Sequence, residues 1–332
     1  MQGWAAADGL PVDRVYPGHP YSMTTGPDGS LYVNDGFSIA RLTPAGIWRL
    51  VIGEGTVSGF PPDGTLARQT GLSLTGSGND RAMAVGPDGT LYFAYNAGNV
   101  GGTNYNLIRK VAGDGRIYTV FGMGGAIKPG ESWRTFLGTS AYHARNGGTG
   151  DIGSLAVGPD GTLYVSPGYA FFAAGAFRIT TDGAMRPFLS SGPLSGAGVR
   201  PGRSQSATVK NLLGDEGRLA TEVANFVFPP EDLQVAADGS VYFLQGYFVW
   251  RVNPDGRLQR LAGRSDPGLV HPAVLPRRRA DPLNTSLTSR GRMALTPDGR
   301  ILLTLSGQPV AHLFLLHSRS EPGDPLPSTT AA

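Results

Sequence analysis

Hydrophobic and polar residues alternate along short stretches of this chain, and turn residues separate one stretch from the next. One example runs through Met83-Ala84-Val85, then Gly86-Pro87-Asp88-Gly89, then the alternating residues 90–94. Asp-Gly tolerates the positive φ of tight hairpin turns, and alternation with a period of two on both sides is typical of paired strands. The pattern therefore predicts β-hairpins and an all-β chain.

This hairpin occurs five times, with a similar apolar pattern after each turn, from Leu-Tyr-Val in the first repeat to Ile-Leu-Leu in the fifth. Its aspartates are separated by 60, 72, 78 and 60 residues; they are Asp28, Asp88, Asp160, Asp238 and Asp298. A second, weaker hairpin follows in four of the repeats, with turns at Ala45-Gly46, Asp114-Gly115, Asp182-Gly183 and Asp255-Gly256. Two hairpins per repeat make a four-stranded meander, which is the blade of a β-propeller.

The fifth repeat has no second hairpin after residues 310–316. At the other end of the chain, Asp8-Gly9 is followed by apolar residues much as Asp255-Gly256 is. We therefore expect the N-terminal strand, about residues 10–16, to complete the last blade and close the ring, because an open ring leaves unpaired edges. The prediction is one propeller over residues 1–317 with a flexible tail over 318–332. Five blades are favoured, and a sixth within residues 190–233 is the alternative.

The repeats resemble NHL repeats, most closely in Gly86-Pro87-Asp88-Gly89-Thr90-Leu91-Tyr92-Phe93 and in Ile108-Arg109-Lys110-Val111. The segments around Asp63-Gly64 and Gly214–Gly217 are similar to those between the blades of teneurin and bacterial Rhs/YD-repeat propellers. The resemblance implies an NHL-type propeller that serves as a module of an extracellular or toxin-type repeat protein. The Ala-Asp pair that usually follows the second strand is present only as Asn34-Asp35.

Composition excludes several classes of protein. Among 332 residues, 50 are Gly and 26 are Pro, and both break helix interiors, so a helical bundle is excluded. The absence of cysteine excludes disulfides, zinc–thiolate sites and a cysteine nucleophile. No apolar run reaches 18 residues, so no membrane span is predicted, and residues 1–10 do not form a signal peptide. The absence of cysteine leaves the compartment unknown, and of the alternatives a secreted or extracellular location is favoured over the cytosol.

The net charge of +3 comes from arginine, because only three of the 28 basic residues are lysines. Such a bias is typical of a GC-rich genome. Arginine also contacts phosphate and guanine, so RNA binding remains a second alternative, as in some NHL propellers. The dense cluster Arg277-Arg278-Arg279 lies between prolines and is interpreted as a solvated loop.

Charged residues just before the innermost strands are the candidates for a site at the mouth of the central channel. They are Asp80, Arg81, Asp151, Glu231, Asp232 and Arg290. Their distances from the following turn differ, so the sequence does not require them to converge. A divalent cation is compatible with these carboxylates but is not implied, and no cofactor is predicted.

Aromatic residues between the second and third strands are the candidates for a contact surface on one rim. They are Phe171, Phe172, Tyr247 and Phe248. The tyrosines that recur after the first turn, such as Tyr32 and Tyr164, are expected to pack between blades. We therefore predict a non-enzymatic scaffold that binds a protein or another domain of a larger chain. The first alternative is a metal-dependent lactonase-like or lyase-like enzyme.

Overall fold

The computed structural model describes most of the repeats and parts of the segments between them. The described residues are 7–15, 20–53, 61–71, 82–100, 103–125, 128, 131, 133–145, 152–167, 175–189, 214–223, 230–245, 248–263, 282–284, 287, 291–296, 299–305 and 312–316.

Four antiparallel sheets of four strands and one of three follow one another along the chain. The first sheet consists of β1 (Ser22–Thr25), β2 (Leu31–Asn34), β3 (Ile39–Leu42) and β4 (Trp48–Ile52). The second consists of β5 (Met83–Val85), β6 (Leu91–Val100), β7 (Thr103–Val111) and β8 (Ile117–Phe121). The third consists of β9 (Ile152–Val157), β10 (Leu163–Pro167), β11 (Ala176–Ile179) and β12 (Met185–Leu189).

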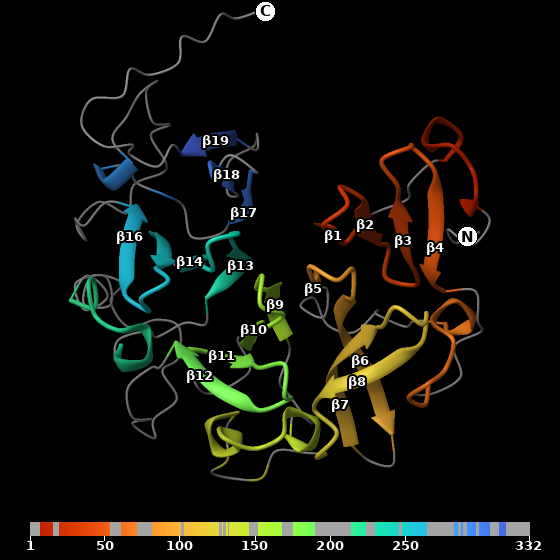
Figure 1. Cartoon of the computed structure of the whole chain (residues 1–332), viewed down its shortest axis with the longest axis horizontal. Coiled ribbons are helices and arrows are strands. Elements are labelled where there is room, and N and C mark those ends of the chain that lie inside the picture. Colours follow the sequence, from red (N-terminus) through yellow and green to blue (C-terminus); the bar gives the residue numbers. More distant parts are fainter. Residues whose placement is uncertain are drawn as a thin grey trace, which may run out of the picture.

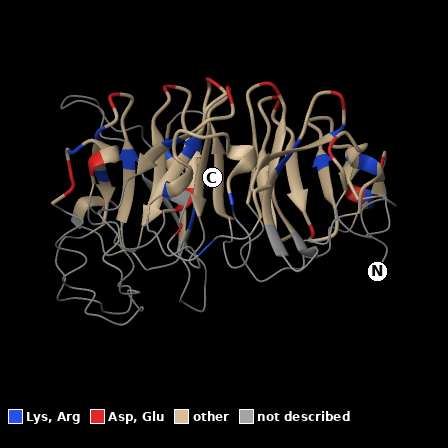
Figure 2. Cartoon of the chain, turned by 90° about the horizontal axis from the view of Figure 1, so that it is seen from below, with Lys and Arg blue, Asp and Glu red and all other residues tan. Residues whose placement is uncertain are grey.

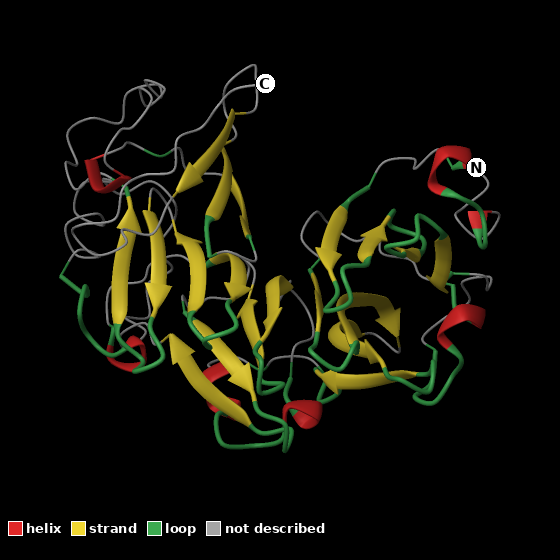
Figure 3. Cartoon of the chain, turned by 45° about the horizontal axis from the view of Figure 1, so that its top comes forward, coloured by secondary structure: helices red, strands yellow, loops and turns green. Residues whose placement is uncertain are grey.

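The fourth sheet consists of β13 (Glu231–Val235), β14 (Val241–Gln245), β15 (Phe248–Val252) and β16 (Leu258–Ala262). Within the described part of the chain, the fifth consists of β17 (Gly291–Leu295), β18 (Ile301–Leu305) and β19 (His312–Leu316). Short 3-10 helices lie between the sheets and towards the outside of the molecule (Figure 3). They are η2 (Val12–Arg14), η3 (Ala67–Gln69), η4 (Trp133–Phe136), η5 (Ala141–His143), η6 (Ala220–Glu222) and η7 (Pro282–Asn284).

The sheets are arranged around a common centre in chain order, with the first strand of each sheet on the inside (Figure 1). The inner strands contact one another in the same order: β1 with β5, β5 with β9, β9 with β13, and β13 with β17. The first and fifth sheets lie at the two ends of this arc, apart from each other, in both Figure 1 and Figure 3. The all-β propeller predicted from the repeats is confirmed.

The number of blades differs from the prediction. Four blades have four strands each, and five or six complete blades are not supported. The alternative sixth blade in residues 190–233 is not supported by the described part of that segment before β13, which holds a turn and η6 but no strand. Residues 190–213 and 224–229 lie outside the described residues, as does the predicted tail over 318–332.

The Asp-Gly turns formed as their chemistry predicts. The glycines of the first turns have φ between 78° and 83°; they are Gly29, Gly89, Gly161, Gly239 and Gly299. An L-residue with a side chain rarely adopts this conformation, so glycine is needed at the position. Each strand pair joined by such a turn is antiparallel.

The core lies between neighbouring sheets rather than within any one of them. In each pair of neighbouring sheets, two repeat positions belong to the same apolar cluster. One is the residue three positions before the turn motif of the later sheet, and the other is the recurring tyrosine of the earlier sheet. These pairs are Met83 with Tyr32, Leu155 with Tyr92, Leu233 with Tyr164, and Met293 with Tyr242. The prediction that the tyrosines pack between blades is therefore confirmed.

A short segment before each complete sheet pairs with the outer strand of that same sheet. We call these segments clasps, and they are residues 9–12, 64–67, 138–141 and 217–220. Each clasp makes three backbone hydrogen bonds; in the first, Gly9 N–H donates to Trp48 O, Trp48 N–H to Leu10 O, and Val12 N–H to Gly46 O. The 3-10 helices η3, η5 and η6 also contact the outer strand of the preceding sheet. Three of the clasps therefore join two neighbouring blades.

This arrangement corrects the prediction that residues 10–16 complete the last blade. Residues 9–12 lie along β4 in the first sheet, and residues 12–14 form η2. An Asp-Gly pair begins a clasp as well as a hairpin turn, and only the partner strand distinguishes the two. Asp8 is the equivalent of Asp63 at the second clasp, and not of the turn residue Asp255.

In the first two clasps, an aspartate precedes the clasp and accepts a hydrogen bond from the third residue of the outer strand. Leu50 N–H donates to Asp8 Oδ1 at 2.8 Å, and Thr119 N–H donates to Asp63 Oδ1 at 2.9 Å. At the third clasp the acceptor is replaced by Leu137, and the third residue of β12 is Pro187, which has no N–H to donate. Acceptor and donor are lost together, so no buried amide is left unsatisfied by the change.

Candidate functional site

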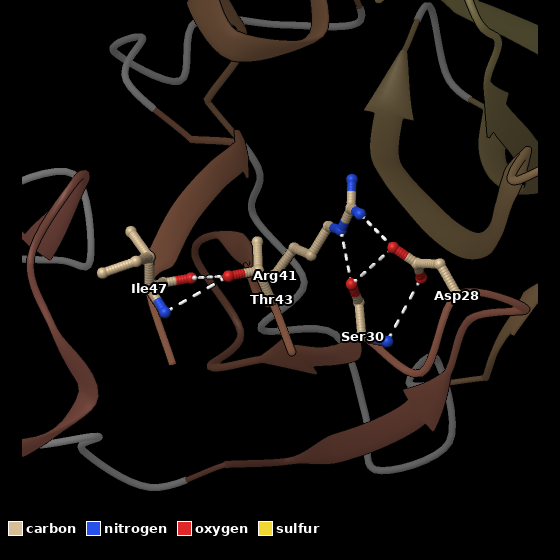
Figure 4. Close-up of polar contacts among 5 residues, drawn as sticks. All are labelled: Asp28, Ser30, Arg41, Thr43 and Ile47. Carbon is tan, nitrogen blue, oxygen red and sulfur yellow. Dashed lines mark hydrogen bonds and ion pairs between the residues drawn. The ribbon is translucent and has the colours of Figure 1, made fainter. Parts of the chain in front are cut away.

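The Asp-Gly turns gather on one rim of the propeller, where acidic residues mark the turns in Figure 2. In the first sheet, Ser30 donates to both carboxylate oxygens of Asp28, from its N–H at 3.1 Å and from its Oγ at 2.9 Å. Arg41 of β3 donates to Ser30 Oγ at 2.8 Å and to Asp28 Oδ2 (Figure 4). The Arg41 guanidinium also lies 5.9 Å from the centre of the Tyr32 ring.

The same network recurs in the fourth sheet. Ser240 donates twice to Asp238, and Arg251 donates to Asp238 Oδ2 at 2.9 Å and lies 5.5 Å from the Tyr242 ring. Hydrogen bonds from the side chain and backbone of Ser30 hold the pKa of Asp28 below its usual value. These carboxylates accept hydrogen bonds within their own sheets, so the rim networks stabilise the turns of the first and fourth sheets.

Asp232, one of the predicted channel residues, has an unusual conformation. It is the second residue of β13, where the pairing with β14 shifts register between Glu231 and Gln234. Among the described residues other than glycine, it alone has a positive φ, of 54°. Its side chain is 15% exposed, and Arg292 Nη1 lies 3.9 Å from Oδ1. Burial raises the pKa of Asp232 to about 6, against lowering by the Met293 N–H and by Arg292.

The carboxylate of Asp232 joins the fourth sheet to the fifth. It accepts a hydrogen bond from the N–H of Met293 on β17. The equivalent position in the third sheet is Ser154, whose Oγ accepts the N–H of Leu233 on β13 at 2.8 Å. Asp232 therefore takes the place of a serine that links neighbouring inner strands, and its burial and strain follow from that structural position.

Of the other predicted site residues, only two are described. Glu231 is half-buried on β13, opposite Leu244. Phe248 is 1% exposed, and its ring centre lies 5.7 Å from that of Trp250. The prediction of a rim aromatic is therefore wrong for Phe248, because this residue begins β15 and its ring enters the core between blades.

The remaining seven predicted site residues lie outside the described residues. They are Asp80, Arg81, Asp151, Phe171, Phe172, Tyr247 and Arg290. The part of the chain that the structure describes contains no group of three or more His, Asp or Glu side chains placed to hold a metal ion. Within the same part, no helix is long and apolar enough to cross a membrane.

One apolar surface was not anticipated from the sequence. Met23 of β1 is 61% exposed, whereas the four equivalent residues of the other sheets are 8% exposed or less. Val12 of the first clasp is 45% exposed, whereas its equivalents Ala67, Ala141 and Ala220 are 4% exposed or less. Leu10 is exposed beside Val12. We call Leu10, Val12 and Met23 the first-sheet face.

Among the described residues, the inner strands contact one another in order from β1 to β17, and the first sheet lies apart from the fifth, so no described blade covers Met23 and Val12. The apolar cluster behind it contains residues of the first sheet and Val15, and none of its described members comes from the fifth sheet. Met23 and Val12 occupy the same repeat positions as the buried residues Met83 and Ala67, and this shared position is the signal that the sequence carries.

These features define an all-β propeller of four-stranded blades. No family model matches the chain, and no curated protein matches it. Solved structures that are similar to it include an auxiliary nutrient binding protein from Bacteroides ovatus, with 11% identity and a TM-score of 0.46 over 87% of this chain and 57% of that one.

Two further similar structures are a calcium-binding regucalcin from Agrobacterium tumefaciens and a gluconolactonase from Xanthomonas campestris. The first has 14% identity and a TM-score of 0.42 over 85% of this chain and 66% of that one. The second has 11% identity and a TM-score of 0.34 over 95% of this chain and 93% of that one. Because identities and TM-scores are this low, the activities named for these proteins are not transferred to this chain.

Proposed function

We propose that the chain is a non-enzymatic binding propeller that contacts its partner through the first-sheet face. The observation that supports this is the exposure of Met23 at a repeat position that is buried in the other four sheets. The partner is a protein or another domain of a larger chain, as expected for an NHL-like module of an extracellular or toxin-type repeat protein.

The exposed side chains are large enough to make this surface a binding site. Burying a methionine, leucine or valine side chain contributes about 2 kcal/mol. Exposed apolar side chains that gather in one part of a soluble protein mark an interaction site more often than single residues scattered over its surface do. Five of the six large apolar side chains that are exposed among the described residues belong to the first sheet, its loops or its clasp; they are Leu10, Val12, Tyr21, Met23 and Phe37.

We also propose that β17–β19 is a fifth, incomplete blade of the NHL type. Met293, Ile301 and Leu303 occupy the same repeat positions as core residues of the complete blades, and all three are buried against the fourth sheet.

A photo-crosslinking residue at position 23 tests the binding role. The control carries the same group at Ala294, which is exposed on β17 of the fifth sheet. In extract of the producing organism, we expect one discrete adduct at position 23, none at position 294, and loss of the adduct when Val12→Lys is added. Equal labelling at both positions, or an adduct that Val12→Lys does not change, would contradict the proposal.

A lactonase-like or lyase-like activity is the second candidate, and Asp232 is the observation that favours it. A carboxyl group with a pKa of about 6 next to the centre of a propeller has the proton affinity of a general base. The test is hydrolysis of a panel of sugar lactones, with and without added calcium, by the wild type and Asp232→Asn. Turnover that disappears in the variant would support this candidate, and no turnover would remove it. RNA binding stays a prediction, because Arg81 and Arg290 lie outside the described residues.

A further inference from the structure

The sulfur chemistry of this chain lies entirely in its methionines. The sequence contains six methionines and no cysteine, so no thiol of the chain competes for an oxidant. The structure describes the methionines at positions 23, 83, 123, 185 and 293. Oxidation of a side-chain sulfur depends on its exposure to solvent. The exposure of each methionine therefore sets the order in which they react.

Met23 differs from the other described methionines in its exposure. It is 61% exposed on β1, whereas three others are 8% exposed or less; they are Met83, Met185 and Met293. Met123 is half-buried. Met83 occupies the same repeat position as Met23 on the next inner strand, but it packs in an apolar cluster with Tyr32 of the first sheet. A dissolved oxidant therefore reaches the thioether of Met23 before those of the buried methionines.

We infer that Met23 is a site of reversible oxidation, and that its sulfoxide weakens binding at the first-sheet face. The inference rests on the proposed binding role and adds a means of regulating it. The oxidant is a hydroperoxide. Its terminal oxygen is transferred to the sulfur as the O–O bond breaks, and its proton moves to the leaving oxygen, which departs as an alcohol, or as water from hydrogen peroxide.

The electrons balance in both directions of this cycle. Oxidation takes two electrons from the sulfur of Met23 and gives them to the peroxide. In the reverse step, which a methionine sulfoxide reductase catalyses, two thiols supply two electrons and become a disulfide, and the sulfoxide oxygen leaves as water. The modification can therefore be removed without replacing the chain.

The fold accommodates a sulfoxide at this position. Met23 pairs with Val33 through the backbone, which a change at the end of the side chain does not alter. Because Met23 is at an exposed position of β1, the sulfoxide oxygen stays hydrated in the free chain. At Met83 the same oxygen would be buried in the apolar cluster with Tyr32, without a hydrogen-bond donor from that ring. Oxidation of Met23 thus changes the surface and leaves the core intact.

A partner on the first-sheet face would bury that oxygen. The sulfoxide is a strong hydrogen-bond acceptor, whereas Leu10 and Val12, the other members of the face, have aliphatic side chains that donate no hydrogen bond. A polar group that is buried without a partner loses its hydration and gains nothing in return. We expect oxidation of Met23 to weaken binding by about tenfold or more.

Hydrogen peroxide tests the selectivity of the reaction. The full chain is oxidised for increasing times, the peroxide is removed, and the sulfoxide at each methionine is quantified by peptide mass spectrometry. We expect Met23 to react about tenfold faster than Met83 or Met293 in the folded chain, and at a similar rate in urea. The thermal melt should be unchanged while only Met23 is oxidised. Equal rates in the folded chain would overturn the oxidation site.

Two substitutions test the effect on binding. Met23→Leu keeps the position apolar and cannot be oxidised, whereas Met23→Gln gives it a polar end like that of the sulfoxide. A photo-crosslinking group at Leu10, which is 41% exposed, reports contact with the partner in the same extract.

Oxidation before mixing should lower the adduct yield of the wild-type chain about tenfold, and a sulfoxide reductase with a thiol should restore it. The yield of Met23→Leu should not respond to peroxide, and that of Met23→Gln should be low without it. An unchanged yield for the oxidised wild type, or an equal loss in Met23→Leu, would overturn the regulation.

The two proposals fail separately. If position 23 forms its Val12-dependent adduct but the oxidised chain still forms the adduct at position 10 in full yield, the regulation is wrong and the binding role stands. If neither position forms an adduct, the proposed function fails and the regulation fails with it. Peptide mapping then still decides whether Met23 is the preferred site of oxidation.

Discussion

Replacing Asp232 with Asn should change how the stability of the protein depends on pH. Burial raises the pKa of this carboxyl from 3.8 to about 6 in the folded chain. Between these two pH values the folded chain holds a proton that the unfolded chain has released. The free energy of unfolding therefore decreases as pH rises through this window. A difference of about two pKa units corresponds to about 3 kcal/mol.

Asparagine removes the charge and keeps the rest of the contact. Its Oδ1 accepts the hydrogen bond from Met293 N–H, and asparagine tolerates a positive φ better than most residues. At pH 4 the wild type is protonated, so the two proteins should be similarly stable. By pH 8 the variant should be more stable by about 3 kcal/mol, the wild type having lost that contribution.

Urea unfolding at pH 4, 5, 6, 7 and 8, followed by the fluorescence of the four tryptophans, measures this difference. The matched control is Asp238→Asn. Burial raises the pKa of Asp238, but hydrogen bonds from Ser240 and the nearby Arg251 outweigh it, and the net pKa is lowered. This control should lose stability at neutral pH, and its difference from the wild type should disappear as pH falls. A difference for Asp232→Asn that varies by less than about 0.5 kcal/mol over the range, or that follows the sign of the control, would refute the reasoning.

Other contacts lead to three further predictions. Asp63→Ala should destabilise the chain by about 3 kcal/mol in urea unfolding, because Arg109 is 0% exposed and donates to Asp63 at 3.0 Å. Asp8→Ala should destabilise the chain less, because the arginine that pairs with Asp8 is exposed, and equal losses would contradict the argument. Deleting residues 1–15 removes the first clasp and its three backbone hydrogen bonds to Trp48 and Gly46, and should lower the free energy of unfolding by about 3 kcal/mol. An unchanged thermal melt would show that the clasp does not stabilise the outer edge of the first sheet. Removing residues 318–332, the predicted flexible tail, should leave stability within about 0.5 kcal/mol, and a larger loss in the same melt would show that the tail packs on the propeller.

The repeats were readable from the sequence because they depend on local chemistry. Asp-Gly turns such as Asp88-Gly89 require glycine at a positive φ, and alternation around them requires one face of each strand to be apolar. The recurring tyrosines occupy one position of that alternation, so their burial between blades follows from the same pattern. Turn, strand and blade were therefore predictable within each repeat.

Only the tertiary structure decided which edge and which face each element meets. Asp8-Gly9 has the local sequence of a hairpin turn, but its neighbours in space make it a clasp on β4. Phe248 has the local sequence of a loop aromatic, yet the sheet before it supplies the core that buries it. Met23 has the same apolar character as Met83, but no described sheet covers it as the first sheet covers Met83. Local propensity is set by a residue and its close neighbours in sequence, whereas burial is set by the element packed on the other side.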